Sequence, residues 1–350
     1  MTYEKQTDTG RKNRDFGADV VRITALFMVL MIHYFLRNGF YYREAAGFFG
    51  FTALMLRSAT LCCVPLFMML TGYLKCGKPW NPAYYRSILP ILFSYLMISL
   101  IHLPYRILIR GEQASAGEWV LRFFHFKLAE YGWYVGMYIG LFLASPLLNL
   151  MWQACSSRKK HLAAVLTLAA LTFLPSSVNQ TQYGNLLPAY FQGVYYVSYY
   201  LIGCYIRTWK PKPRRHLCVI FVLIPTFALA FLNLATRTEA DNFYSGFHGG
   251  YNSILTALMT TSLFLLLYQC RCRKEKLRRC AAHFSGVVFE IYLLSYIADT
   301  NIYPLFYKQY SMGLYLPVGI VMILAVFILT YPAAFFVNRL SKRLAARLFM

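Results

Sequence analysis

Three ionisable side chains lie inside one long apolar stretch near the start of the sequence. Asp19, Arg22 and His33 fall within residues 16–38, where most other residues are apolar. Ionisable groups are costly in such a segment, which makes them candidates for function. A neutral imidazole can accept a proton from a hydroxyl group near neutral pH. A guanidinium group can hold a phosphate, so the three residues offer an acid–base group together with an anion-binding group.

The spacing of these residues places them on one side of a helix. Arg22 and His33 are separated by about three helical turns plus about 20°, so they share a face and lie about 16 Å apart along the axis. Asp19 precedes Arg22 by one turn, which allows an ion pair. The alternative is that Arg22 extends to the membrane interface and His33 caps the other end of the helix. The shared face and the neighbouring Asp19 favour a functional interpretation.

The composition of the chain indicates a membrane protein. Of its 350 residues, 58% are hydrophobic and 14% are charged, whereas soluble domains carry about 25% charged residues. Its apolar stretches are close to the roughly 20 residues that a helix needs to cross a bilayer. We therefore expect an all-α, polytopic integral membrane protein with about ten transmembrane helices. The expected helices are 16–38, 54–74, 87–109, 131–153, 161–175, 190–206, 217–235, 249–270, 284–307 and 314–338.

The distribution of charge gives these helices an orientation. When the N-terminus is placed in the cytoplasm, every cytoplasmic segment is basic, and these segments hold most of the 35 Lys and Arg residues. Basic loops mark the cytoplasmic side of membrane proteins. Both termini are therefore expected in the cytoplasm, with a leader at 1–15, a membrane domain at 16–338 and a tail at 339–350. The net charge of +22 then belongs to membrane loops, and no nucleic-acid partner is expected.

Segments outside the helices add few further candidates. The leader lacks a small-residue cleavage site, so no cleavable signal peptide is expected. The longest outer loop, 110–130, is expected to form a short amphipathic segment on the outer surface. The cysteines fall in the membrane or on its cytoplasmic side, which is reducing, so no disulfides are expected. Cys270, Cys272, Cys280 and His283 do not have the spacing of a standard metal site, and no metal is expected.

A second motif lies in the second expected span, between Val64 and Leu74. Pro65 removes a backbone hydrogen bond and can kink the helix. The small residues Thr71 and Gly72 allow another helix to approach closely. Phe67 belongs to the same run, which helix packing alone would explain.

Together the two motifs resemble those of the type-3 acyltransferases, integral membrane enzymes that O-acylate surface polysaccharides. Asp19, Arg22 and His33 match the first hallmark of that family, an Arg and a His separated by ten residues in the first span. The run from Val64 to Leu74 matches the second, with Thr71 in the place of a serine. Weaker similarities, such as Trp133-Tyr134 in the fourth span, extend the resemblance over nearly the whole chain.

Two positions depart from the family pattern. Where many members have a histidine in the ninth span, this chain has Ser295, although Glu290 and Asp299 lie on either side of it. Many members also have two arginines entering the third span, whereas this chain has Arg86 alone. His102 is a spare candidate for the missing histidine, with a hydrogen-bonded core residue as the alternative.

The resemblance implies a donor and its binding residues. The donor would be an acyl-CoA, most simply acetyl-CoA, which is used as a co-substrate without a permanently bound cofactor. Its phosphates would meet a basic cytoplasmic mouth formed by Lys75, Lys78 and Arg86, because Lys and Arg bind phosphate well. Arg22 would hold the pyrophosphate or polarise the thioester.

The resemblance also implies an acceptor, which would be a hydroxyl of a surface glycan or of a lipid-linked saccharide. His33 would be the general base, or would carry the acyl group covalently. Asp19, Glu290 and Ser295 would support it. Aromatic clusters at 34–42 and 183–200 suit sugar stacking, although aromatic residues also gather at membrane interfaces. The expected location is a bacterial plasma membrane.

Two other classes of function fit parts of the sequence. A transporter or flippase of a glycan or lipid-linked precursor could use ten spans arranged as inverted repeats. The pair formed by Arg22 and His33, however, has no counterpart in the second half of the chain. A non-catalytic sensor on the same fold would account for Ser295. Turnover of the donor separates the enzyme from both.

Overall fold

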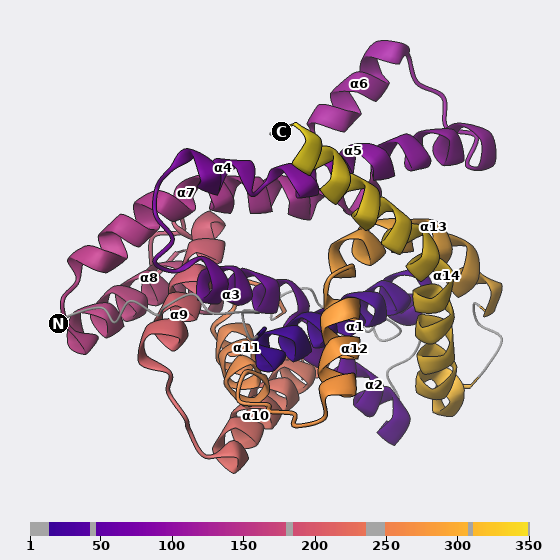
Figure 1. The fold of residues 1–350 in the computed structure, drawn as a ribbon. Coiled ribbons are helices and arrows are strands. Elements are labelled where there is room, and N and C mark those ends of the chain that lie inside the picture. The colour runs from indigo at the N-terminus through magenta and orange to yellow at the C-terminus, as the bar shows by residue number, and fades with distance from the viewer. Residues whose placement is uncertain (1–13, 43–46, 180–184, 236–248, 307–310, 349–350) are drawn as a thin grey trace.

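The computed structural model describes residues 14–42, 47–179, 185–235, 249–306 and 311–348. The regular secondary structure in these ranges is helical, with no strand, which confirms the all-α class (Figure 1). Most of the expected leader lies outside the described residues. The helices are α1 (Phe16–Arg37), α2 (Gly47–Thr60), α3 (Cys63–Lys75), α4 (Pro82–Arg86), α5 (Leu89–Pro104), α6 (Ala116–Phe124), α7 (Trp133–Ala154), α8 (Arg158–Val178), α9 (Tyr195–Trp209), α10 (Arg215–Ala235), α11 (Ile254–Leu267), α12 (Glu275–Ser285), α13 (Val288–Ile302) and α14 (Met312–Arg347).

Within the described ranges, seven helical segments are long and apolar enough to cross a membrane. An eighth is formed if α12 and α13, which meet at an angle of 58°, make up one span. Two further expected spans correspond to α9 and α11, which are shorter, with 15 and 14 residues. The total of about ten spans and the cytoplasmic position of both termini stay predictions.

The second expected span is interrupted. It comprises α2 and α3, which are separated by a turn at Leu61 and Cys62. Pro65 is the third residue of α3, and the backbone N–H groups of a helix's first turn have no partner inside the helix. The missing N–H of Pro65 therefore costs little there, and the interruption lies just before the proline.

The last helix is longer than expected. α14 continues past residue 338 to Arg347, into the segment expected to be a cytoplasmic tail. Ser341 and Ala345 are buried in this extension, and the hydroxyl oxygen of Ser341 lies 2.9 Å from that of Ser94 on α5. Packing against α5 thus holds the extension in helical form.

The first helix lies in the middle of the bundle, where it packs against α2, α3, α11, α12, α13 and α14 (Figure 1). Asp15 caps its start, because its carboxylate accepts hydrogen bonds from the backbone N–H groups of Gly17 and Ala18. The same carboxylate accepts from the hydroxyl of Tyr73 at 2.8 Å, which joins α1 to α3. α1 ends at Arg37, and Gly39 then takes a positive φ of 67°, which glycine adopts readily.

Two glycines allow α3 and α9 to pack in close contact. A Cβ atom on Gly72 would lie 1.9 Å from the carbonyl oxygen of Tyr200, and one on Gly203 would lie 2.0 Å from that of Met69. Gly72 therefore lies where α9 approaches α3 closely. Thr71 has a different role, since its hydroxyl donates to the carbonyl of Phe67 in its own helix.

The expected amphipathic segment in the loop 110–130 is the helix α6, which projects from the bundle in Figure 1. Its apolar side chains Val120 and Phe124 are exposed. Glu112 ties it to the bundle through ion pairs with Arg106 at 2.8 Å and Arg122 at 3.0 Å. Partial desolvation opposes ionisation of Glu112, but its hydrogen bonds and charge interactions with these two arginines outweigh that effect and lower its pKa.

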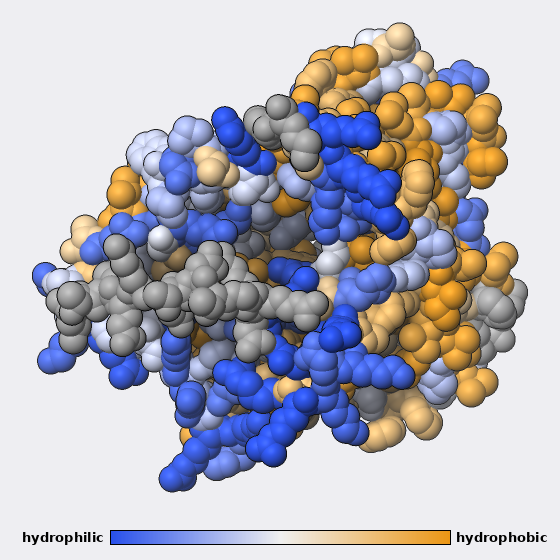
Figure 2. All heavy atoms as spheres, viewed as in Figure 1, coloured by the Kyte–Doolittle hydropathy of each residue, from blue (hydrophilic) through white to orange (hydrophobic). Residues whose placement is uncertain are grey.

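Hydrophilic side chains gather on one part of the surface. In Figure 2 one such group lies in the lower middle of the view, over the neighbouring ends of α10, α11 and α12. The loops there are basic and include Lys210, Lys212 and Arg271. This is the side that the sequence assigns to the cytoplasm.

Candidate active site

His33 lies against an aspartate from the other end of the chain. Its Nδ1 atom is 3.5 Å from Oδ2 of Asp299 on α13. This distance is too long for a well-formed hydrogen bond, and within the described part of the chain Nδ1 has no hydrogen-bond partner. Apo sites often show such long contacts, which shorten when substrate binds. His33 is 8% exposed and Asp299 is fully buried, so the pair is nearly enclosed.

Two further side chains hold Asp299 in place. The hydroxyl of Tyr131 donates a hydrogen bond of 2.6 Å to Oδ2 of Asp299. Nε of Arg37 lies 3.2 Å from Oδ1 and also donates to the Tyr131 hydroxyl at 3.0 Å. The Tyr131 ring stacks on the imidazole of His33, with 3.8 Å between ring centroids. The carboxylate is thus oriented by a cation and a hydroxyl, and the imidazole by a ring.

His33 opens onto a cavity of about 270 Å³, here called the His33 cavity. Its lining includes the polar side chains of His33, Arg37 and Glu130. Trp133 and Tyr251 also line it, with their rings stacked at a centroid distance of 6.3 Å. The cavity therefore combines aromatic faces with charged groups beside the imidazole.

Arg22 is held at the other end of the same helix. Its Nη1 atom donates to the hydroxyl of Ser285 at 2.9 Å, and that hydroxyl donates to Oδ1 of Asp19 at 2.6 Å. The expected pair of Asp19 and Arg22 is present, with 3.9 Å between charged atoms. Arg14 binds Asp19 more closely, at 2.9 Å. The bend between α12 and α13 brings Ser285 into this cluster, which positions the guanidinium.

Arg22 lines a second cavity of about 240 Å³, here called the Arg22 cavity. Thr71 and Lys75 of α3 share it, and the rest of its lining is mainly aliphatic and aromatic, including Phe67. Val29 of α1 lines both cavities. Arg22 and His33 thus open onto adjacent cavities along one helix, which agrees with the expected common face.

The remaining expected site residues lie apart from these cavities. Lys78 follows α3, and its backbone carbonyl accepts from Asn149 at 3.4 Å. Arg86 is exposed at the end of α4. Glu290 is buried on the side facing α5 and α14, where it accepts hydrogen bonds from Ser94 at 2.7 Å and Asn338 at 2.9 Å.

Ser295 and His102 also make contacts inside the helical core. The hydroxyl of Ser295 donates to the carbonyl of Tyr292 in its own helix at 2.9 Å. Nδ1 of His102 lies 2.9 Å from the carbonyl oxygen of Ile98, and the imidazole is fully buried. His102 is thus a hydrogen-bonded core residue, which was the alternative to a role as the missing histidine. Among the described residues, no group of three His, Cys, Asp or Glu side chains is arranged to hold a metal ion.

Sequence reasoning named Asp299 only as a neighbour of Ser295, and it passed over Tyr131 and Arg37, which also surround His33. Asp299 lies one turn after Ser295, on the helix where the family places its late histidine, so an acid inside that apolar span was the available signal. Tyr131 precedes α7, in a 3₁₀ turn at Glu130–Gly132, and nothing in its local sequence marks it. Arg37, at the end of α1, had the appearance of an ordinary interfacial arginine.

A family model described as an acyltransferase domain matches residues 15–337. No curated protein and no solved structure matches the chain. The matched region begins at the cap of α1 and ends within α14, so it contains Arg22, His33 and Asp299. Because the match covers nearly the whole chain, the protein belongs to the type-3 family of membrane acyltransferases.

Proposed function

We propose that the protein moves a short acyl group, in the first place acetyl, from a cytoplasmic acyl-CoA to a hydroxyl of a cell-envelope glycan. One observation carries this proposal. His33, paired with Asp299, lines a cavity directly adjacent to the one that Arg22 lines. An acid–base group and an anion-binding group therefore serve two compartments that meet, as transfer between two substrates requires.

The geometry around His33 supports general-base catalysis. With a proton on Nδ1, facing Asp299, Nε2 is the nitrogen that can take the proton of the acceptor hydroxyl. The hydroxyl oxygen forms a bond to the thioester carbonyl carbon, the C–S bond breaks, and the proton passes from His33 to the leaving thiolate. The carboxylate of Asp299 orients the imidazole and stabilises its charged form during the step.

Charge on the expected cytoplasmic side supports an acyl-CoA donor. Arg22 and Lys75 both line the Arg22 cavity. Both were expected from the sequence to bind the donor. A larger cavity of about 450 Å³ at the start of α1 is lined by four cationic side chains, which are Arg207, Lys210, Lys212 and Arg271. Cationic side chains of this kind suit the phosphates of a nucleotide. Lys78 and Arg86 are on the same side of the bundle and stay candidates for donor binding.

The aromatic groups of the His33 cavity support a sugar acceptor. Trp133 is partly exposed and, with Tyr251, offers flat apolar faces for a sugar ring. Glu130 adds hydrogen-bond acceptors for sugar hydroxyls. In contrast, Tyr34 of the cluster at 34–42 is fully buried and donates to the carbonyl of Tyr315, and Tyr183 lies outside the described residues.

The test is transfer of labelled acetyl from acetyl-CoA to a crude envelope glycan extract by the purified protein in lipid. We expect label in the glycan with the wild-type protein and none with His33→Ala at equal protein level. Binding of acetyl-CoA, measured separately, should survive in the variant. Transfer by His33→Ala would refute the assignment of the base. Absence of both turnover and donor binding in the wild-type protein would favour a transporter.

A further inference from the structure

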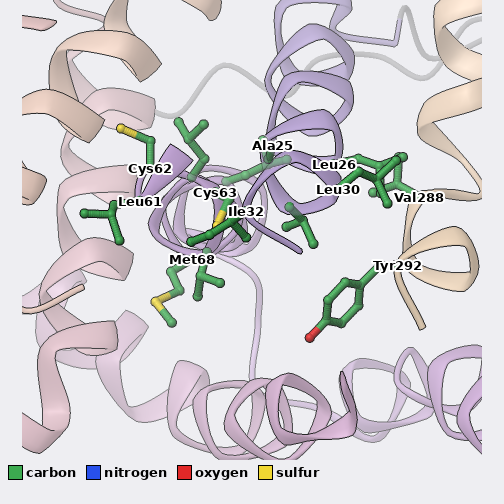
Figure 3. Close-up of a cluster of buried hydrophobic side chains, with 14 of the residues drawn as sticks. Ala25, Leu26, Leu30, Ile32, Leu61, Cys62, Cys63, Met68, Val288 and Tyr292 are labelled. Carbon is green, nitrogen blue, oxygen red and sulfur yellow. The ribbon is translucent and has the colours of Figure 1, made fainter. Parts of the chain in front are cut away.

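The two cavities share three lining residues, which are Val29 of α1, Val64 of α3 and Tyr292 of α13. Resting on the proposed function, we infer that these three side chains form the wall against which the acyl chain of the donor lies, and that they restrict transfer to short acyl groups. They are 2%, 4% and 6% exposed. All three belong to the main buried core, part of which Figure 3 shows with Tyr292 labelled.

The positions of the three side chains are fixed from several sides. Val29 lies on α1 between Arg22 and His33, one turn before the histidine. The hydroxyl of Tyr292 donates a hydrogen bond of 2.6 Å to the backbone carbonyl of Tyr131. Its ring packs edge-on against Tyr134, with 5.8 Å between centroids. The wall is therefore preorganised rather than adaptable.

The geometry of a thioester carbonyl directs the acyl chain at this wall. The carbonyl carbon carries the sulfur, the oxygen and the acyl chain in three directions about 120° apart in one plane. The sulfur must point back into the Arg22 cavity, where the donor enters. The acceptor hydroxyl arrives from the His33 cavity. The acyl chain is then left to lie against the residues between the cavities.

Close packing makes this wall sensitive to the length of the chain. Because the two valines and the aromatic ring are already almost fully buried, methylenes added to an acyl chain that lies against them would have to displace a neighbour. Val→Ala removes two methyl groups, and so creates room for the extra carbons of a longer chain at that point. A change from Val to Ala elsewhere in the Arg22 cavity does not create space at these three side chains.

The experiment compares transfer from butyryl-CoA and acetyl-CoA by the purified protein in lipid. In Val29→Ala and Val64→Ala the ratio of butyryl to acetyl transfer should rise by about ten-fold or more. The matched control is Val288→Ala, because Val288 is equally buried but lines the Arg22 cavity alone. Its ratio should stay at the wild-type value. A narrowing variant, Val64→Ile, should lower the ratio of propionyl to acetyl transfer.

The outcomes separate this inference from the proposed function. Acetyl transfer by all variants with an unchanged ratio would overturn the inference and leave the proposed function standing. An equal rise of the butyryl-to-acetyl ratio in Val288→Ala would also overturn the inference, because the three shared residues would then not be what selects the acyl chain. Transfer from none of the three donors by the wild-type protein would overturn both. Val64→Ile keeps the test decisive if an alanine variant does not fold.

Discussion

Asp299 joins three side chains at the site, since its two oxygens face His33, Arg37 and Tyr131. A carboxylate in this position has two effects on an imidazole. It fixes which nitrogen carries the proton, and it stabilises the positive charge that appears when the other nitrogen takes a second proton. The first two predictions concern single residues of this kind.

Asp299→Asn should lower kcat by about 10²–10⁴-fold while the KM for acyl-CoA stays close to its wild-type value. The amide keeps the size of the side chain but removes the charge that stabilises a protonated His33. Steady-state kinetics of acetyl transfer measure both constants. The control is Ser295→Ala, which should retain activity because the Ser295 hydroxyl, among the described residues, bonds to a carbonyl of its own helix. Normal kcat in Asp299→Asn would show that the contact with His33 has no catalytic role.

Arg22→Gln distinguishes the two roles that remain open for this arginine. If Arg22 holds a phosphate group, the KM for acyl-CoA should rise about ten-fold or more and kcat should change little. A fall in kcat at constant KM would instead place the guanidinium at the thioester. We expect the first result, because Arg22 is far along the helix from His33. The control is Arg14→Gln, since Arg14 binds Asp19 without lining the cavity; equal effects of both changes would refute a direct contact with the donor.

At the scale of elements, regular periodicity made the first helix predictable. The number of residues between Arg22 and His33 was enough to place both on one face of the helix. In the structure the two side chains line adjacent cavities, as a common face would require. The interruption between α2 and α3 was not predicted, because Pro65 was interpreted as a kink within one helix. A proline in the first turn of a helix and a proline in its interior look alike in sequence. Which of the two it is depends on whether a turn interrupts the helix just before it.

The contact of α3 with α9 gives the prediction at this scale. Gly203→Ala should destabilise the protein by about 1–3 kcal/mol, because the added methyl group would have to displace backbone of α3. The loss of stability is measured by thermal unfolding in detergent at one heating rate, monitored by fluorescence-detected size-exclusion chromatography. Gly140→Ala on α7 is the matched control, since a Cβ atom there meets nothing within 4 Å. Equal melting midpoints for the two variants would contradict the close packing seen at this crossing.

At the scale of the whole molecule, the site depends on a contact that no local pattern encodes. His33 and Asp299 come from opposite ends of the chain, and they meet because α1 and α13 pack side by side. The sequence showed an acid inside an apolar span, but it could not show which helix that acid faces. Membrane class and helix positions follow from composition and periodicity, whereas the partners of a buried charge follow from packing.

Orientation in the membrane is the remaining property of the whole molecule, and two short amphipathic helices test it. α6 belongs to an expected outer loop and α12 to an expected cytoplasmic one. Each has a glutamate in its first turn, Glu118 and Glu275. Because basic residues concentrate around α12, we expect it on the cytoplasmic side.

Glu118→Cys should therefore react with a membrane-impermeant maleimide in intact cells, whereas Glu275→Cys should react only after the membrane is permeabilised. The wild-type protein is a necessary reference, because its Cys280 on α12 is exposed. Cys280 of the wild-type protein should stay unlabelled in intact cells and become labelled when the membrane is permeabilised. Labelling of Cys280 in intact cells would invert the topology, and would place Arg22 toward the outside and His33 toward the cytoplasm. Acyl-CoA would then have to enter from the side of His33, so this result would remove the basis for assigning Arg22 to the donor.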